Sequence, residues 1–284
     1  MKDLSSSKTI LVPTDFTKVA QTALDHANHI ATLLNKTVTL LHVVKEDKEK
    51  KKADEQIKAI ASDNKLKSGI ETSTVVDVGS IFTEIGKVAD IVGAALVVMG
   101  THGVKGIQKL VGSYALRVIT NSNVPFVVVQ EKAFADHGYK NIVLPMYFAK
   151  ESKQKLEWAV YVAKLFNSKC HIIADYESDE FSAKAVTNNV AYSRSFLKNN
   201  GVDFEVTELD KNSASLEKET IRYSVKVNAD LIVVMTTLDK SLSEFIIGTP
   251  EQYIIANEAQ IPVMCINPID IMRSKEGLTI AFGG

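Results

Sequence analysis

An internal duplication of the chain is the strongest constraint on its fold. The segment NIVLPMYF at 141–148 repeats TILVPTDF at 9–16, and IIGTPEQYIIANEAQIPVMCIN later repeats LVGSYALRVITNSNVPFVVVQ. The repeated unit spans about 130–140 residues, an ordinary size for one domain. We therefore predict a first domain at 1–132, a second at 140–267 and a tail at 268–284.

Strand and helix patterns alternate within each unit. The predicted strands of the first unit lie at 8–13, 37–44, 70–77, 95–99 and 124–130, and Ser80 is expected to cap the helix that follows the third of them. Such alternation predicts a parallel sheet with helices on both faces, and continuous apolar runs such as ALVVM are typical of buried parallel strands. The predicted fold class is α/β, with two tandem, doubly wound, five-stranded parallel sheets. We expect the short apolar fifth strands, 125–129 and 262–266, to cover each other's edges in an intramolecular pseudodimer.

Composition and charge argue against several classes of protein. The formal net charge is −1, so there is no global electrostatic reason to expect binding to nucleic acid or to a membrane. Cys170 and Cys265 both lie in apolar runs and are expected to be buried reduced thiols. The N-terminus shows no signal-peptide pattern and no run of eighteen apolar residues occurs, so we expect a cytoplasmic protein.

A glycine-rich stretch, VMGTHGVKGIQKLVGS at 98–113, follows the fourth predicted strand. Gly100 comes directly after that strand, and Gly112 with Ser113 opens the next helix. Glycine lets backbone N–H groups approach a ligand closely, and a helix N-terminus favours anions. The stretch therefore predicts a phosphate cradle, although it matches neither the P-loop nor the dinucleotide fingerprint. A glycine-rich surface turn without a ligand is the alternative.

A family resemblance bears on this choice. The fragments ILVPTDF, LLHVV, VVMGTHG, VGS and VPFVVV occur in the order in which the universal stress protein family has them, and the second half matches as a degenerate copy. The chain thus resembles a tandem universal stress protein. The resemblance implies ATP-binding α/β domains that pair through their fifth strands, with the nucleotide motif G-x2-G-x9-G-[ST].

The resemblance also implies a set of site residues. These are Pro13, Thr14, Asp15, Val43, Met99, Gly100, Gly103, Gly112, Ser113, Tyr114 and Ala115. Asp15, with its two preceding residues, would meet the ribose or adenine, and Val43 would wall the adenine pocket. Gly103 would approach the phosphates, and Gly112 with Ser113 would cradle them. Met99 and Gly100 would line the site, while Tyr114 and Ala115 would offer backbone groups. Eight residues, rather than the nine of the motif, separate Gly103 from Gly112.

The second half departs much further from the motif. Tyr147 stands where Asp15 stands, and an alignment of MTTLD with MGTHG puts Thr236 in place of Gly100 and Asp239 in place of Gly103. An aspartate facing a triphosphate would repel it. The second half is therefore expected to be a structural partner, or to bind a less anionic ligand.

Three functions remain open from the sequence. The first is an ATP-binding stress-response or regulatory protein, a nucleotide sensor with little or no hydrolysis, which Mg²⁺ could accompany. The second is a non-nucleotide ligand-binding or protein-interaction scaffold, and the third is an adenylate-handling enzyme with His102 and Lys105 as weak candidates. We assign no catalytic residue and no metal site, since His26 and His29 have no evident third ligand. A homodimer and a regulatory protein partner are also expected, and Asp15 could be a plain helix-terminal acid.

Overall fold

The computed structural model describes residues 7–101, 111–236 and 249–268. The first half contains β1 (Thr9–Pro13), α1 (Lys18–Leu34), β2 (Thr37–Val44), the 3₁₀ helix η1 (Asp47–Glu49), α2 (Lys50–Ser68), β3 (Thr72–Val78), α3 (Ile81–Ile91), β4 (Ala94–Gly100), α4 (Val111–Thr120) and β5 (Phe126–Val129). The second half contains β6 (Asn141–Met146), the 3₁₀ helix η2 (Lys150–Lys153), α5 (Lys155–Phe166), β7 (Lys169–Ala174), α6 (Glu180–Asn199), β8 (Phe204–Glu208), α7 (Leu216–Lys226), β9 (Leu231–Met235), α8 (Pro250–Ile255) and β10 (Val263–Ile266).

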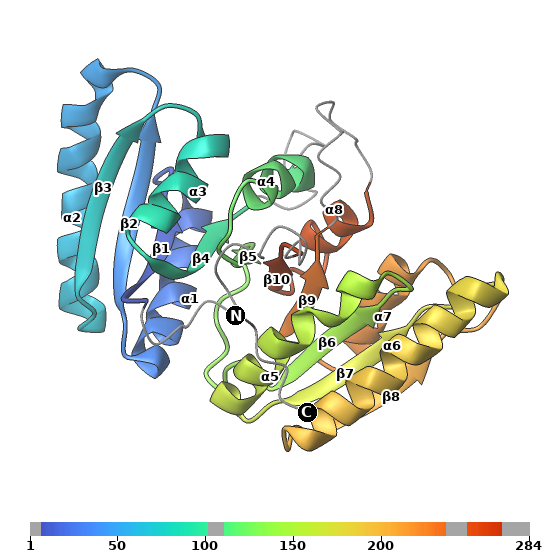
Figure 1. Ribbon diagram of the computed structural model, residues 1–284. Helices are drawn as coiled ribbons and strands as arrows, with labels where there is room; N and C mark the ends of the chain where they lie inside the picture. Colours follow the sequence, from blue (N-terminus) through green and yellow to red (C-terminus); the bar gives the residue numbers. More distant parts are fainter. Residues whose placement is uncertain (1–6, 102–110, 237–248, 269–284) are drawn as a thin grey trace, which may run out of the picture.

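All ten strands form one continuous sheet, in the order β3-β2-β1-β4-β5-β10-β9-β6-β7-β8 (Figure 1). Within each half the strands are parallel. Only β5 and β10 pair antiparallel, with Val127 opposite Met264. The predicted fold class and the predicted meeting of the fifth strands are both confirmed. The two sheets do more than pack side by side, because backbone hydrogen bonds join them edge to edge.

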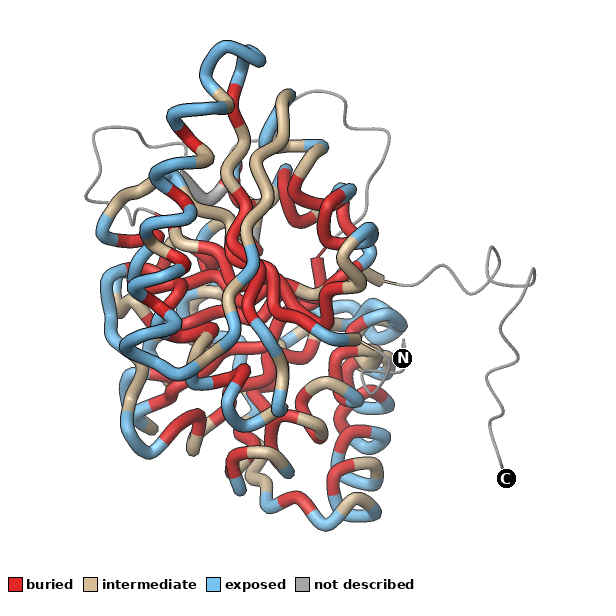
Figure 2. Tube along the Cα trace, turned by 90° about the vertical axis from the view of Figure 1, so that its left-hand side faces the viewer, coloured by how far each residue is buried: buried red, intermediate tan, exposed pale blue. Residues whose placement is uncertain are grey.

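Helices cover both faces of the sheet, as the apolar strands require. Side chains of α1, α2, α5 and α6 pack in one core cluster, and those of α3, α4, α7 and α8 pack in a second one. The central strands are buried, whereas exposed residues gather on the outer surfaces of the helices (Figure 2). A strand that is covered on both faces has apolar residues at successive positions, so it forms an unbroken apolar run in the sequence. These strands could therefore be predicted from the sequence.

Local capping also follows from the sequence. The Ser80 hydroxyl accepts a hydrogen bond from the Phe82 N–H, at 3.3 Å, and so caps α3 as predicted. Asn35 and Asn167 end α1 and α5 in the left-handed conformation, and each lies equally far from the first strand of its half. The two halves therefore keep one length from that strand to the end of the following helix.

Two amides lock the halves together at the join. The Gln130 side chain, just after β5, donates to the Asn257 carbonyl beyond α8, at 2.9 Å. The Asn267 side chain, just after β10, donates to the Ile119 and Ser122 carbonyls at the end of α4, at 2.6 and 2.7 Å. Each half thus provides acceptors for the other at the end of its last helix, and α4 is held at its C-terminus by the second half.

Candidate functional site

The loop after β1 carries the first group of expected site residues. The Thr14 N–H donates to the Leu41 carbonyl at 2.8 Å, which ties the loop to β2. Asp15 is exposed, and its carboxylate accepts from the Thr17 N–H at 3.1 Å and from the Thr17 hydroxyl at 2.5 Å. The Thr17 hydroxyl in turn caps α1 by accepting from the Ala20 N–H. Asp15 is therefore not the N-cap itself, but it orients the residue that is.

Phe16 holds this loop in an unusual conformation. Its φ is +67°, a left-handed value that costs an aromatic residue about 1–3 kcal/mol. Its N–H donates to the Thr14 hydroxyl at 3.1 Å, and its ring stacks on His42 with the centroids 4.3 Å apart. The His42 ring nitrogen Nδ1 lies 2.7 Å from the Thr14 carbonyl. The sequence gave no sign of this arrangement, because nothing in TDF marks a positive φ.

The expected residues gather where the strand order reverses. In the first half β1 lies between β2 and β4, and the β1–β4 pairing stops at Leu11 and Val97, before either strand ends. Pro13, Val43 and Gly100 all lie at the carboxyl ends of these three neighbouring strands. Open parallel sheets bind ligands at this edge, next to the reversal in strand order.

Gly100 has a structural reason to be glycine. A Cβ added there would lie 2.7 Å from the Val19 carbonyl oxygen and 2.9 Å from its carbonyl carbon. The first turn of α1 therefore packs directly on the end of β4, and only a residue without a side chain fits. The preceding residue, Met99, is buried in the core. The sequence led us to explain this glycine by a ligand, whereas helix packing accounts for it without one.

The start of α4 carries the last group. Gly112 and Ser113 are the second and third residues of this helix, and Ser113 is 4% exposed. Tyr114 is 41% exposed and stacks on Phe82 with the ring centroids 5.7 Å apart, while Ala115 is buried. A helix start of this kind presents backbone N–H groups and a partial positive charge. Gly103, His102 and Lys105 lie outside the described residues.

The second half differs at each of these points. Asn189 of α6 donates its amide to three carbonyls of the loop after β6, those of Tyr147, Phe148 and Ala149, at 2.7, 3.3 and 3.1 Å. The Tyr147 N–H donates to the Ser152 hydroxyl at 3.2 Å. Burial raises the pKa of the Tyr147 hydroxyl well above its ordinary value. Side chains of the second half, Asn189 and Ser152, therefore hold the loop after β6 in place.

Strand register corrects one of our alignments. The Thr101 N–H donates to the Val129 carbonyl at 2.8 Å, and the Thr236 N–H donates to the Ile266 carbonyl at 2.9 Å. Since β5 and β10 are equivalent strands, Thr236 corresponds to Thr101, and Met235 occupies the place of Gly100. The expectation that Thr236 replaces Gly100 was wrong by one residue. Asp239, the expected counterpart of Gly103, lies outside the described residues.

Comparison with known proteins decides the family. The model of the family described as "Universal stress protein family" matches residues 6–130 and again 138–267. The chain belongs to the universal stress protein family. It is 32% identical over 156 residues to the universal stress protein MJ0577 of Methanocaldococcus jannaschii, an alignment that covers 44% of this chain and 96% of that relative.

Solved structures agree on the fold of this tandem universal stress protein. A universal stress protein from Archaeoglobus fulgidus matches with a TM-score of 0.76 at 19% identity, over 92% of this chain and 99% of that one. A protein of unknown function, PA1789, from Pseudomonas aeruginosa matches with a TM-score of 0.64 at 16% identity, over 95% and 96% of the two chains. At these identities the likeness establishes the architecture alone.

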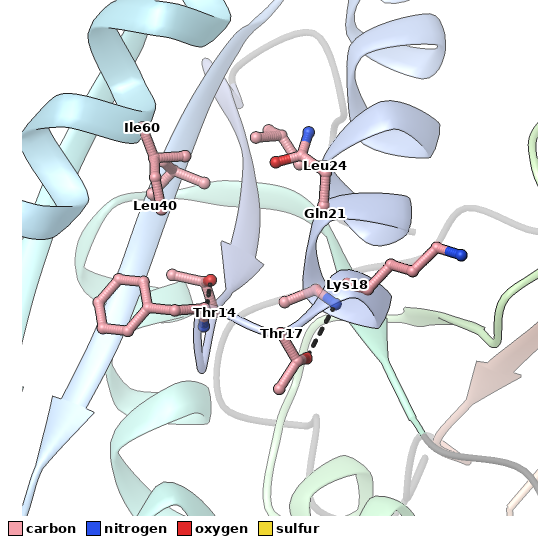
Figure 3. Close-up of a pocket in the computed structure, with 9 residues that line it drawn as sticks. Thr14, Thr17, Lys18, Gln21, Leu24, Leu40 and Ile60 are labelled. Atoms are coloured by element: carbon pink, nitrogen blue, oxygen red, sulfur yellow. Dashed lines mark hydrogen bonds between the residues drawn. The ribbon is translucent and has the colours of Figure 1, made fainter.

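An open pocket of about 310 Å³ borders the loop after β1 of this universal stress protein (Figure 3). It is lined by Thr14, Phe16, Thr17, Lys18, Ala20, Gln21, Leu24, Leu40 and Ile60. Leu24 on α1 and Ile60 on α2 form apolar walls, and Thr14 with Thr17 forms the polar end (Figure 3). Sequence reasoning missed this pocket, because α1 and α2 were both interpreted only as covering helices.

Charged groups enter the core of the second half. Lys155 of α5 is fully buried, and its ammonium group donates to the Pro145 carbonyl at the end of β6. Burial lowers the pKa of this lysine to about 7. Counted from the first strand of each half, Lys155 stands where Ala23 stands. Burial also raises the pKa of Asp175, just after β7, to about 6.

Two further properties concern only the part of the chain that the structure describes. Within 7–101, 111–236 and 249–268, no group of three or more histidine, cysteine, aspartate or glutamate side chains is placed to hold a metal ion. Over the same residues, no helix has the length and apolar character needed to cross a membrane.

Proposed function

We propose that the first half binds an adenine nucleotide, with ATP as the first candidate, and that the protein acts as a stress-response or regulatory nucleotide sensor in the cytoplasm. One observation carries the proposal. Pro13, Val43 and Gly100 lie at the ends of three neighbouring strands, and Gly112 and Ser113 lie in the first turn of α4, although these positions are far apart in the sequence.

The chemistry of these groups suits a nucleotide. The first turn of α4, which contains Gly112 and Ser113, has backbone N–H groups that suit an anion. The exposed Asp15 carboxylate is positioned by Thr17, as a group that accepts hydrogen bonds from ribose hydroxyls should be. A nucleotide bound here would bring Mg²⁺ with it as its own counter-ion.

The proposal includes little or no hydrolysis. Asp15 is the carboxylate among the expected site residues; its Oδ1 accepts from Thr17, and in this proposal its Oδ2 accepts from the ribose rather than from an attacking water. A general base needs a free lone pair within reach of the attacking water. Turnover of ATP in the presence of Mg²⁺ measures this part of the proposal separately from binding.

A homodimer would need a surface other than the fifth strand. In this chain β5 and β10 already pair with each other, so the backbone hydrogen-bonding groups along their edges are occupied. The family's pairing is therefore made within one chain, and we propose that any further association uses another face.

A binding module without nucleotide is the second candidate, and the pocket between α1 and α2 favours it. Its walls are largely apolar, and it opens on the side of the loop after β1 that Phe16 occupies. A small amphiphilic ligand would suit such a pocket better than a triphosphate would.

Calorimetric titration of the purified chain with ATP tests the proposal. We expect one site per chain, with binding lost in Asp15→Asn and Gly112→Val. The matched control is Thr249→Val, since Thr249 is the second-half counterpart of Ser113 and its buried hydroxyl has no hydrogen-bond partner among the residues that the structure describes. Binding should survive in that control. No heat with wild-type protein at millimolar ATP, or an equal loss in the control, would reject the first-half site.

A further inference from the structure

Of the five large aromatic side chains that the described part of the second half exposes, four lie on α6 or in the loops after β6 and β7, and the fifth, Tyr253, lies on α8. Phe181 is 81% exposed, Phe148 50%, and Tyr176 and Tyr192 are each 45% exposed. We call these four residues the aromatic surface. Single exposed apolar residues are common, but several together mark a place where another molecule binds.

The fold brings these residues to one side of the second half. Met146 pairs with Ala174 at the ends of β6 and β7, so Phe148 and Tyr176 each follow two residues after a paired position. Asn189 then binds the Phe148 carbonyl to α6, the helix that carries Phe181 and Tyr192. In Figure 1, α6 runs alongside β7 and β8 on the outer side of this half.

The aromatic surface is held rigid before any partner arrives. The three carbonyls bound by Asn189 fix the loop that carries Phe148. The Lys153 ammonium lies 5.1 Å from the centre of the Tyr192 ring, which also stacks on Phe196 with the centroids 5.8 Å apart. A surface that is ordered in advance loses less entropy when it binds.

The carboxylates next to the aromatic surface favour a positively charged partner. The segment 175–180, DYESDE, carries four carboxylates and no cation between its aromatic neighbours. Asp179 accepts from the Ser182 N–H at 2.8 Å, which lowers the pKa of its carboxyl and keeps it ionised. Lys150 and Lys153 lie on the side of η2, and Lys153 is already held over Tyr192. The segment 175–180 is therefore acidic, and the exposed Lys184, one turn further along α6, is the cation that follows it.

Among its described residues, the first half has no such surface at the same place. Phe16, the counterpart of Phe148, is turned inward onto His42. The segment 45–52, KEDKEKKK, has five lysines and no aromatic residue, where the second half has acids and aromatics. The difference points to a role that only the second half performs.

We propose that the aromatic surface docks a basic amphipathic segment of another protein, with apolar side chains on the rings and Lys or Arg toward 175–180. Aromatic rings provide apolar area and cation–π contacts, and the carboxylates add long-range attraction. This docking does not depend on nucleotide binding by the first half, and the two can be tested separately.

A labelled synthetic helix with Leu on one face and Arg on the other is the probe. Fluorescence anisotropy with the full-length protein should show saturable binding that weakens as salt is added. A helix with Glu in place of Arg, and one with Ser in place of Leu, should bind at least about tenfold more weakly.

Matched variants assign the binding to this surface. We expect Phe148→Ser/Phe181→Ser to weaken binding by at least about tenfold, and Glu177→Gln/Glu180→Gln to weaken it and flatten its salt dependence. The control is Leu66→Ser/Ile91→Ser, which removes two apolar side chains of the first half that are 86% and 71% exposed. Five of the six side chains are exposed and Glu177 is half-buried, so thermal unfolding should confirm that each variant is folded.

Three results would overturn the proposal. The first is equal binding of the acidic helix, and the second is an equal loss of binding in the first-half control. The third is concentration-dependent self-association in sedimentation velocity that Phe148→Ser/Phe181→Ser abolishes, because the occupant would then be a second copy of this chain. If every variant still binds ATP, nucleotide binding by the first half does not depend on the aromatic surface.

Discussion

The two halves of this universal stress protein share one frame but treat the carboxyl end of the sheet differently. In the first half the loop after the first strand borders an open pocket, and Phe16 holds a left-handed backbone beside an exposed Asp15. In the second half the equivalent loop is bound from within by Asn189. The two halves have the same order of strands and helices, while one has an open edge and the other has a filled one.

In the second half, polar and charged side chains, rather than larger apolar ones, fill the edge that is open in the first half. Lys155 takes the place of Ala23, and Glu251, near the start of α8, is 6% exposed where Ala115 is buried in the first half. Buried charge does not stabilise a core as apolar packing does. The second half therefore fills this region without becoming a plain hydrophobic support.

The largest expected effect comes from exchanging these side chains. Ala23→Lys should destabilise the protein by about 3–5 kcal/mol, because it buries an ammonium group in a core that evolved without one. Urea denaturation measures this change. Ala23→Met, which adds comparable length without charge, is the control and should cost less. If the two variants were equally stable, the first half would tolerate a buried lysine as well as the second half does.

Lys155 should also make stability depend on pH. The pKa of this lysine is about 7 in the folded protein and near its ordinary 10.5 when unfolded. Between these values the unfolded chain holds a proton that the folded chain has released, so stability rises with pH. From pH 7 to 9 the wild type should gain about 2–3 kcal/mol relative to Lys155→Met, at up to about 1.4 kcal/mol per pH unit.

The comparison with Lys155→Met separates this lysine from other buried groups. Asp175 has a raised pKa of about 6, which lies below pH 7–9. Burial raises the pKa of Cys170 to about 12, so this thiol titrates within the window only in the unfolded chain, and it does so in both proteins. Chemical denaturation of wild type and Lys155→Met at several pH values gives the two slopes. Parallel slopes would mean that Lys155 keeps its proton in the folded protein, and that the second half stabilises a buried charge.

Asn189 offers a smaller but cleaner comparison. Asn189→Ala should destabilise the protein by about 2–3 kcal/mol, because three carbonyls lose their donor. Asn64→Ala is the first-half control, since Asn64 on α2 is similarly buried but bonds mainly to the side chains of Asn28 and Thr72. We expect a smaller loss there in the same denaturation assay. Equal losses would show that the closed loop owes little to Asn189.

The sequence predicted the features that depend on pattern. Apolar runs and helical periodicity gave the strand and helix order, and the apolar fifth strands gave the join between β5 and β10. The Ser80 cap followed from residue type and position. These features depend on neighbours in the chain, which a sequence displays directly.

What the sequence could not give depends on contacts between distant segments. The letters VVM occur before both Gly100 and Thr236, yet the hydrogen-bond register equates Thr236 with Thr101. The burial of Lys155 was hidden in a helix with several lysines, and Asn189 gave no sign that it would reach a loop some forty residues earlier. Register and long-range donors are set by how the strands pair in three dimensions, so similarity of letters does not reveal them.

Gly100 gives the smallest expected effect and the sharpest test of what the glycine-rich stretch is for. Gly100→Ala should destabilise the protein by about 1–2 kcal/mol, because the new Cβ would meet the Val19 carbonyl at 2.7 Å. Met235→Ala is the comparison, since the equivalent position at the end of β9 already accommodates a Cβ. Denaturation and ATP titration should be measured on the same preparations. If Gly100→Ala instead kept wild-type stability and lost ATP binding, the glycine would be retained for a ligand, and the close approach of α1 would be only its consequence.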